Sequence, residues 1–114
     1  MSTSEEIIAL HKQYVMPSYA PGLVLVKGKG VKVWDADGKE YMDFLAGIAV
    51  LGLGHCHPQV VKAIRTQAAK LMHVSNLYYN ENQPKLAQAL STRSMNGKCF
   101  FCNSGAEANE GMFK

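Results

Sequence analysis

The sequence predicts a mixed α/β fold, and three observations carry this prediction. Between residues 23 and 44, short runs rich in β-branched and aromatic residues are separated by glycine-containing turns, as in antiparallel strands. Elsewhere apolar residues recur every three or four positions, which is typical of amphipathic helices. Residues 98–114 follow the order of an apolar strand, a tight turn and the start of a helix.

Composition and charge exclude several classes of protein. The 114 residues are 47% hydrophobic and 18% charged, which indicates a soluble globular chain, long enough for one domain and too short for two. The net charge is +3 and the twelve Lys and Arg are scattered, so there is no electrostatic footprint for nucleic acid. The polar start resembles no targeting peptide, no apolar run could cross a bilayer, and three cysteines cannot all pair. These features predict a cytoplasmic protein that contacts neither nucleic acid nor membrane.

The first predicted element is a helix over Ser4–Val15. Thr3 and Glu6 have the spacing of a capping box. The apolar residues of the segment share one helical face: Ile7, Leu10 and Tyr14. The segment 16–22, which contains two prolines and a glycine, then breaks regular structure.

Three short strands are predicted next. They cover Leu23–Val26, Val31–Trp34 and Glu40–Phe44. A turn at Lys27–Gly30 separates the first two strands. Asp35–Gly38, reading D-A-D-G, is a strong hairpin signal between the second and the third.

An apolar stretch punctuated by glycines, residues 46–54, leads into a further helix. Its glycines suit close packing against another backbone or a ligand. Pro58 fits the first position of a helix, whose apolar residues lie on one face: Val61, Ile64, Ala68 and Leu71.

The remaining segments are a loop, a helix and a strand. Residues 73–82 are polar and aromatic and are predicted to form the loop, in which Tyr78 and Tyr79 suit a pocket lining and surface packing equally well. A helix is predicted from Gln83 to Ser94, followed by Asn96-Gly97 as its end. The apolar run Cys99–Cys102 is predicted to be a strand.

The last predicted element is a helix opened by Ser104. Ser104 suits the N-cap position, and Glu107 completes a capping box. Gly105 has no Cβ, so a ligand could approach its backbone, and the exposed N–H groups of a helix start favour an anion such as phosphate. On local chemistry alone, a well-capped helix without a ligand is the favoured interpretation of these residues, because capping boxes are common.

Two clusters with the appearance of metal or redox sites are interpreted as structural. His55, Cys56 and His57 are adjacent and cannot easily converge on one ion, so no metal site is predicted and the histidines are expected to be buried or to cap a helix. Cys99 and Cys102 have C-x-x-C spacing, but in a strand these side chains would point to opposite faces. A redox pair is therefore not predicted.

Several motifs in order resemble one enzyme family. They are G-K-G-V-K-V-W-D-A-D-G-K-E-Y-M-D-F-L-A-G-I-A-V-L-G-L-G-H-C-H-P, then H-V-S-N-L-Y-Y, then N-S-G-A-E-A-N-E. Together they resemble the class III aminotransferases, which depend on pyridoxal phosphate, from about Tyr14 to Lys114. The resemblance implies the N-terminal part of a fold-type-I enzyme. Residues 1–72 would belong to its small domain, and residues 73–114 would begin its large cofactor-binding domain.

The resemblance also implies roles for individual residues. Ser104, Gly105 and Ala106 would bind the cofactor phosphate through the backbone. Ile48 would bind substrate at a position where relatives that act on free ornithine tend to have tyrosine, and an apolar residue there suits an acylated amine. Tyr79 would form an aromatic gate to the substrate channel. Leu51 departs from the Asn or Thr often found at its position.

The family's essential catalytic groups lie beyond residue 114, so no catalytic residue is predicted in this chain. The Schiff-base lysine is among them, and the helix opened by Ser104 reaches Lys114 without a stop signal. We therefore expect an N-terminal part of a homodimeric enzyme, inactive by itself. The complete enzyme would transfer the terminal amino group of N-acetylornithine to 2-oxoglutarate, giving glutamate, in arginine biosynthesis. The alternatives are an ornithine, succinylornithine or 4-aminobutyrate aminotransferase, or a short non-catalytic protein that binds phosphate ligands or partners.

Overall fold

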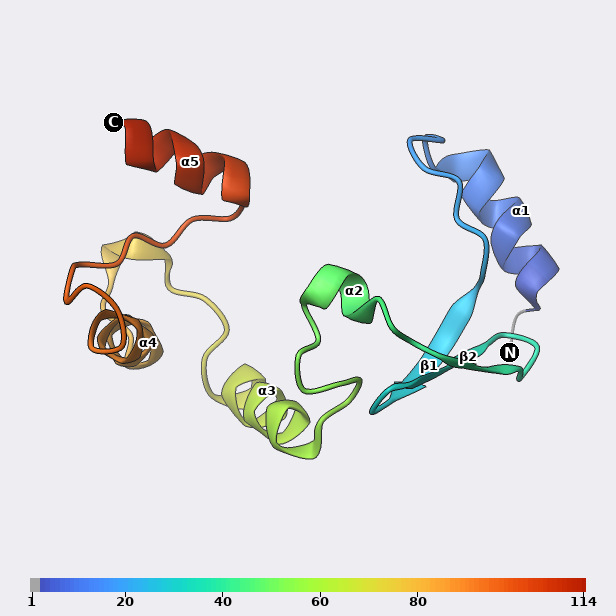
Figure 1. Cartoon of the computed structure of the whole chain (residues 1–114), viewed down its shortest axis with the longest axis horizontal. Helices are drawn as coiled ribbons and strands as arrows, with labels where there is room; N and C mark the ends of the chain where they lie inside the picture. The colour runs from blue at the N-terminus through green and yellow to red at the C-terminus, as the bar shows by residue number, and fades with distance from the viewer. Residues whose placement is uncertain (1–2) are drawn as a thin grey trace. The chain divides into compact units, whose positions relative to one another are not determined.

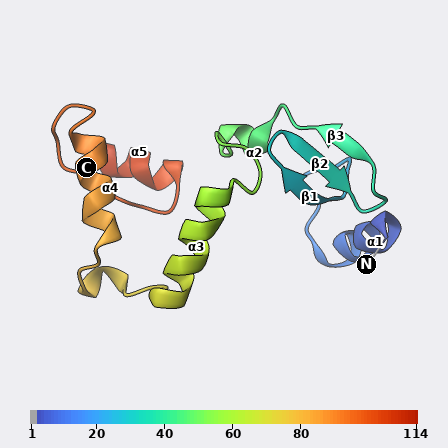
Figure 2. The ribbon, with the colours of Figure 1, turned by 90° about the horizontal axis from the view of Figure 1, so that it is seen from below.

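The computed structural model describes residues 3–114, which divide into two units. Figures 1 and 2 show the elements of both. The first unit ends at Lys70 and the second begins at Leu71. This division lies two residues before the boundary predicted from the sequence. The assignment of the two parts to a small and a large domain of a longer enzyme stays a prediction.

The first helix, α1 (Ser4–Tyr14), has the capping box that the sequence predicts. The Thr3 hydroxyl accepts a hydrogen bond from the Glu6 N–H, and the Glu6 carboxylate accepts one from the Thr3 N–H, at 3.3 and 3.1 Å. The helix ends one residue earlier than predicted, because Val15 is extended (φ −108°, ψ 129°).

A three-stranded antiparallel sheet forms the body of the first unit. Its strands pair in chain order: β1 (Leu25–Lys29), β2 (Lys32–Asp35) and β3 (Glu40–Met42). The predicted turn at Lys27–Gly30 is wrong, because β1 continues to Lys29, which pairs with Lys32. The chain reverses instead at Gly30, whose φ of +59° is a conformation that glycine adopts without a Cβ clash.

The turn between β2 and β3 is organised by Asp35, which is buried, with only 8% of its surface exposed. One carboxylate oxygen accepts hydrogen bonds from the N–H groups of Asp37 and Lys39, and the other accepts from the Tyr41 hydroxyl at 2.8 Å. The Tyr41 hydrogen bond is the main cause that lowers the pKa of Asp35. The predicted hairpin is confirmed.

Two helices follow β3 in the first unit. The short α2 (Ala46–Ala49) was not predicted, and its backbone has left-handed dihedrals. The longer α3 (Pro58–Lys70) begins at Pro58, as the sequence predicts. The carbonyl of His57 accepts the Val61 N–H at 3.0 Å, which starts the helical ladder.

The second unit is helical. It contains a 3₁₀ turn, η1 (Ser75–Leu77), and two α-helices, α4 (Asn82–Ser91) and α5 (Gly105–Phe113). Helix α4 ends three residues before the predicted Ser94, where the hydroxyls of Thr92 and Ser94 bond to carbonyls of the last turn. The predicted strand Cys99–Cys102 is wrong: among the described residues of this unit there is no strand with which it could pair.

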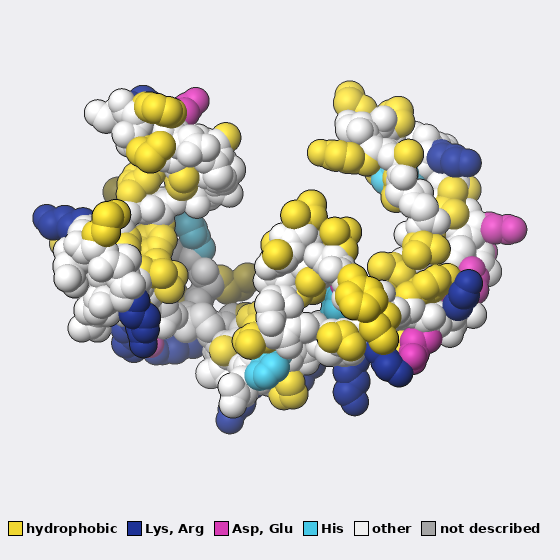
Figure 3. All heavy atoms as spheres, viewed as in Figure 1, with side chains coloured by type: hydrophobic (Ala, Val, Ile, Leu, Met, Phe, Trp, Pro, Cys, Tyr) yellow, Lys and Arg dark blue, Asp and Glu magenta, His cyan; other side chains and the backbone are white. Residues whose placement is uncertain are grey.

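Most apolar side chains of both units are exposed. In residues 3–114, Val33 is the one apolar residue classed as buried. The accessible surface is 10529 Å². Two compact domains of the same lengths as the two units, residues 1–70 and 71–114, would together expose about 7,400 Å². Figure 3 shows hydrophobic side chains open to solvent over both units. The chain therefore carries apolar surface of the kind that proteins bury against other structure.

Candidate cofactor and substrate site

The start of α5 is built by Ser104. Its backbone is extended (φ −151°, ψ 161°), and its hydroxyl accepts the Glu107 N–H at 3.2 Å. The Glu107 carboxylate accepts the N–H of Asn103 at 2.6 Å, one residue before the position expected for a capping box. The N-cap is confirmed, and the reciprocal contact is displaced by one residue.

The first turn of α5 has the features of a phosphate cradle. The N–H groups of Gly105 and Ala106 have no acceptor within the helix, because they belong to its first turn. A Cβ built on Gly105 would meet nothing within 4 Å, so the space beside its backbone is open. The positive end of the helix dipole lies at the same place. The residues fit the phosphate of a cofactor, although the nearby Glu107 carboxylate opposes an anion there.

Ile48, the predicted substrate-binding residue, lies in the left-handed turn of α2. The φ angles of Ala46, Gly47, Ile48 and Ala49 are 49°, 63°, 60° and 62°. For residues with a Cβ this conformation costs about 1–2 kcal/mol each, and it is rare for a β-branched residue such as isoleucine. The Ile48 residue is 83% exposed. A strained turn therefore presents this apolar side chain outward.

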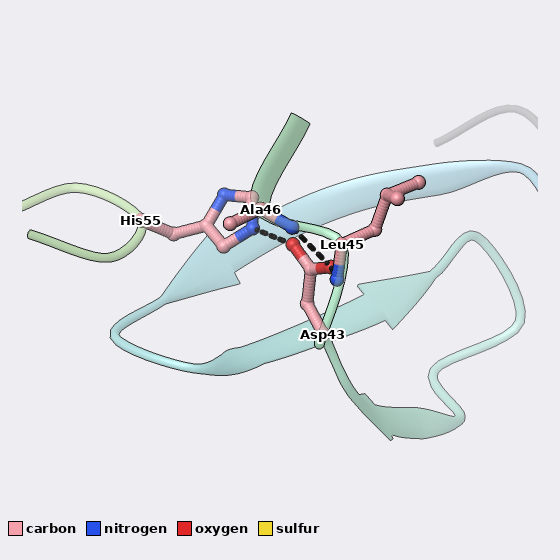
Figure 4. A network of polar contacts seen from close by, with 4 residues as sticks. All are labelled: Asp43, Leu45, Ala46 and His55. Atoms are coloured by element: carbon pink, nitrogen blue, oxygen red, sulfur yellow. Dashed lines mark hydrogen bonds and ion pairs between the residues drawn. The ribbon is translucent and has the colours of Figure 1, made fainter. Parts of the chain in front are cut away.

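The turn is attached to Asp43, the first residue after β3 (Figure 4). Asp43 Oδ1 accepts the N–H groups of Leu45 and Ala46, both at 2.9 Å. Asp43 Oδ2 lies 2.6 Å from His55 Nε2. The hydrogen bond to His55 is the largest cause that lowers the pKa of Asp43, and the two N–H groups lower it further. An ionised carboxylate only accepts, so the ring nitrogen Nε2 carries the proton.

His55 is in turn fixed to the β1–β2 turn. Its N–H donates to the Gly30 carbonyl and its carbonyl accepts the Gly30 N–H, at 2.8 and 2.9 Å. The imidazole lies over Gly28, where a Cβ would come within 2.6 Å of the ring. A pocket of about 280 Å³ opens beside the pair, lined by Gly30, Val31, Asp43, Ala46, Leu51, Gly52, Leu53, Gly54 and His55.

The predicted gate residue and the two cysteines with C-x-x-C spacing lie in the second unit. Tyr79, the predicted gate, follows η1 in the second unit and is fully exposed. Cys99 Sγ contacts the carbonyl of Ala87, whereas Cys102 Sγ contacts that of Ser104. The argument that a strand separates the two thiols was wrong, because the strand is absent.

Within residues 3–114, no three His, Cys, Asp or Glu side chains gather as metal ligands, nor is any helix long and apolar enough to cross a membrane.

The Asp43–His55 pair is the part of the site that sequence reasoning missed. The two residues lie twelve positions apart, in segments without a common periodicity. The glycines at 28 and 54 were its only signal, since each allows a close approach: a Cβ on Gly28 would lie 2.6 Å from the His55 ring, and a Cβ on Gly54 would lie 2.8 Å from the Gly30 carbonyl oxygen.

Comparison with known proteins identifies the family. Residues 14–114 match the family described as Aminotransferase class-III. The chain belongs to this family. The chain is 55% identical over 109 residues to the acetylornithine aminotransferase of Caldanaerobacter subterraneus subsp. tengcongensis. This match covers 95% of the chain and 28% of that relative. It is 54% identical over 113 residues to that of Methanocaldococcus jannaschii, covering 98% and 28%.

Solved structures of this family have the same fold over the whole chain. The acetylornithine aminotransferase of Elizabethkingia anophelis matches with a TM-score of 0.93 and 37% identity, over 100% of this chain and 30% of that one. The ornithine aminotransferase of Toxoplasma gondii matches with a TM-score of 0.91 and 37% identity, over 99% and 27%. The chain thus has the fold of an N-terminal segment of the fold-type-I aminotransferases. It spans less than a third of the length of the relatives that it matches.

Proposed function

We propose that this chain is the N-terminal part of a pyridoxal-phosphate-dependent enzyme that transfers the terminal amino group of N-acetylornithine to 2-oxoglutarate. The observation that carries this proposal is the 54–55% identity to two acetylornithine aminotransferases over nearly the whole chain. The enzyme would act in arginine biosynthesis in the cytoplasm. By itself the 114-residue chain would be inactive, since no lysine here lies in the family's Schiff-base motif.

The cofactor phosphate would be held by the backbone of Ser104, Gly105 and Ala106. The open N–H groups at the start of α5 and the free space beside Gly105 support this role. Bound pyridoxal phosphate supplies an electron sink for the carbanion formed at the substrate carbon. The contribution of this chain is to orient the cofactor through its phosphate. A relative, the taurine:2-oxoglutarate aminotransferase of Bifidobacterium kashiwanohense, has been solved in complex with PLP and glutamate, at 33% identity and a TM-score of 0.89.

The amino donor would be recognised through Ile48 and Tyr79. Ile48 presents an apolar side chain, which suits an acylated amine because a free ammonium group would lie unpaired against it. A 52% identical relative from Buchnera aphidicola is named acetylornithine/succinyldiaminopimelate aminotransferase, and both of those substrates carry an acylated amine. Tyr79 would be the aromatic gate of the substrate channel.

A second subunit and the rest of the enzyme would cover the exposed apolar surface. The accessible surface of the chain is larger than that expected for two compact domains, which supports burial of this surface against a large partner. We propose a homodimer of the complete protein, with residues 1–72 in the small domain and residues 73–114 at the start of the large one.

The first alternative is an ornithine aminotransferase, because a structure with that name matches at the same 37% identity, with a TM-score of 0.91 against 0.93 for the acetylornithine enzyme. Succinylornithine or 4-aminobutyrate would be other donors within the class. A short protein that only binds phosphate ligands or partners is the alternative outside it.

Steady-state kinetics of the complete protein test the proposal. We expect kcat/KM for N-acetylornithine to exceed that for free ornithine by about tenfold or more, because an unpaired buried amine costs about 1–3 kcal/mol. Cofactor absorbance that shifts when the donor is added should accompany turnover. A preference for free ornithine would refute the substrate assignment, and absence of any transamination would refute the enzyme assignment.

A further inference from the structure

We propose that Asp43 and His55 form a positioning pair that holds the left-handed turn Ala46–Ala49 and thereby aims Ile48 at the acyl group of the donor. The proposal rests on the proposed function for its effect on substrate choice. Its structural part depends only on contacts within the first unit.

The first step is that the turn needs an external restraint. Four successive residues, 46–49, have positive φ, and three of them are not glycine, including the β-branched Ile48. Residues in this region persist only when surrounding contacts determine their conformation. The Ile48 residue is 83% exposed and so makes few contacts of its own, whereas the two residues that lead into the turn are hydrogen-bonded to a side chain.

The second step is that Asp43 supplies this restraint. Its Oδ1 accepts the N–H groups of Leu45 and Ala46, which are the two residues that lead into the turn. Bonds from two consecutive N–H groups to one ionised oxygen determine the direction in which the chain leaves β3. Asp43 therefore acts on Ile48 through the backbone, without touching substrate itself.

The third step is that His55 holds the carboxylate in place. The Oδ2–Nε2 distance is 2.6 Å, and the Asp43 and His55 side chains are 15% and 24% exposed, so the pair is partly shielded from water. Two backbone hydrogen bonds with Gly30 and the close approach to Gly28 tie His55 to the sheet. The sheet thus holds His55, His55 holds Asp43, and Asp43 holds the turn.

The same geometry argues against a catalytic pair. The Nδ1 side of the imidazole lies over Gly28, where a Cβ would come within 2.6 Å of it. Among the described residues, no nucleophilic side chain is hydrogen-bonded to Nδ1, as a hydrolytic triad would require. Positioning is the role that the contacts support.

The test uses the complete protein with four variants. Asp43→Ala removes both acceptor oxygens, and Asp43→Asn keeps one oxygen for the two N–H groups. Gly28→Ala changes neither member of the pair but displaces the His55 imidazole, because its added methyl group would collide with the ring. Gly22→Ala is the matched control, because a Cβ there meets nothing within 4 Å. Amide hydrogen exchange of Leu45 and Ala46 is measured beside the ratio of kcat/KM for N-acetylornithine to that for ornithine.

We expect exchange of the two amides to rise by about tenfold in Asp43→Ala and to rise in Gly28→Ala. The specificity ratio should fall by about tenfold in Asp43→Ala, since a displaced contact group loses its discrimination. Asp43→Asn should restore most of both values, and Gly22→Ala should match the wild type. A merely structural role would lower kcat/KM for both donors equally and leave their ratio unchanged.

Unchanged exchange in Asp43→Ala would overturn the pair as the restraint on the turn. Raised exchange with an unchanged ratio would overturn its role in specificity. If Asp43→Ala does not fold, Gly28→Ala takes its place and is judged by the same two measurements. If the wild-type protein turns over neither donor, the proposed function fails, and the exchange rates still decide whether the pair holds the turn.

Discussion

At the scale of single residues, two aspartates of the first unit act as acceptors for backbone N–H groups. Asp35 organises the β2–β3 turn and Asp43 organises the entry to α2. Both carboxyls have a lowered pKa, in each case first because of a side-chain hydrogen bond. A folded-state pKa below the unfolded value stabilises the fold above that unfolded value, and the stabilisation is lost as the pH falls through the folded pKa.

The pKa of Asp35 gives a direct prediction. We expect its carboxyl to titrate below the ordinary value of 3.8, with Tyr41→Phe moving the midpoint upward, because the Tyr41 hydroxyl is the main cause of the lowering. Carboxyl-carbon NMR of the complete protein between pH 2 and about 6 measures both midpoints. An unchanged midpoint in Tyr41→Phe would contradict the assignment of the cause.

Gly105 gives a second prediction at this scale. Gly105→Ala adds a methyl group where the structure has open space, so the fold should keep its stability. The same methyl group would meet a bound phosphate, and we expect cofactor affinity to fall by about tenfold, roughly 1.4 kcal/mol. Titration of the apoprotein with pyridoxal phosphate measures this. Gly97→Ala, where a Cβ also meets nothing within 4 Å, is the control, and equal affinities in the two variants would refute a phosphate at Gly105.

At the scale of elements, α1 and α5 begin with equivalent caps, but only α5 is proposed to bind a ligand. Thr3 and Ser104 each accept the N–H of the residue three positions later. A cap that only starts a helix and a cap that also binds phosphate respond differently to added negative charge, since Asp caps helices well but repels an anion.

This difference predicts the outcome of paired substitutions. Ser104→Asp should keep stability and weaken cofactor binding, whereas Ser104→Ala should cost about 1 kcal/mol and weaken binding as well. Thr3→Ala should have a similar cost in stability without any change in cofactor affinity. Thermal unfolding of the apoprotein and cofactor titration distinguish these results. Full cofactor affinity in Ser104→Asp would place the phosphate elsewhere.

At the scale of the whole molecule, the apolar surface is larger than two small units can leave open as stable structures. Only Val33 among the described apolar residues is classed as buried, and a domain of this length depends on a core for its stability. Exposed residues such as Phe44, Tyr79 and Phe113 require cover from elsewhere.

The 114-residue chain in isolation should therefore behave differently from the complete protein. We expect strong binding of a hydrophobic dye and a broad, non-cooperative unfolding transition, because few apolar contacts would be lost together. The complete protein should bind little dye and unfold in a sharp transition. Dye fluorescence and calorimetry on both forms make the comparison. A sharp transition in the short chain, with little dye bound, would favour the independent small protein.

The sequence by itself determined the features that depend on neighbouring residues. The two helix caps, the start of α3 at Pro58 and the D-A-D-G hairpin follow from spacings of four residues or fewer, because the interacting groups lie within one turn of the chain. The family motifs identified the class III aminotransferases for the same reason, since they are read residue by residue.

Tertiary structure alone decided the rest. The run Cys99–Cys102 has strand-like residues but forms no strand among the described residues, because a strand requires a partner that composition cannot supply. The left-handed turn around Ile48 contradicts the local preference of isoleucine, and it exists where Asp43 and His55 meet across twelve positions. Local chemistry determines where elements begin, whereas hydrogen bonds between distant segments determine which strained conformations the chain keeps.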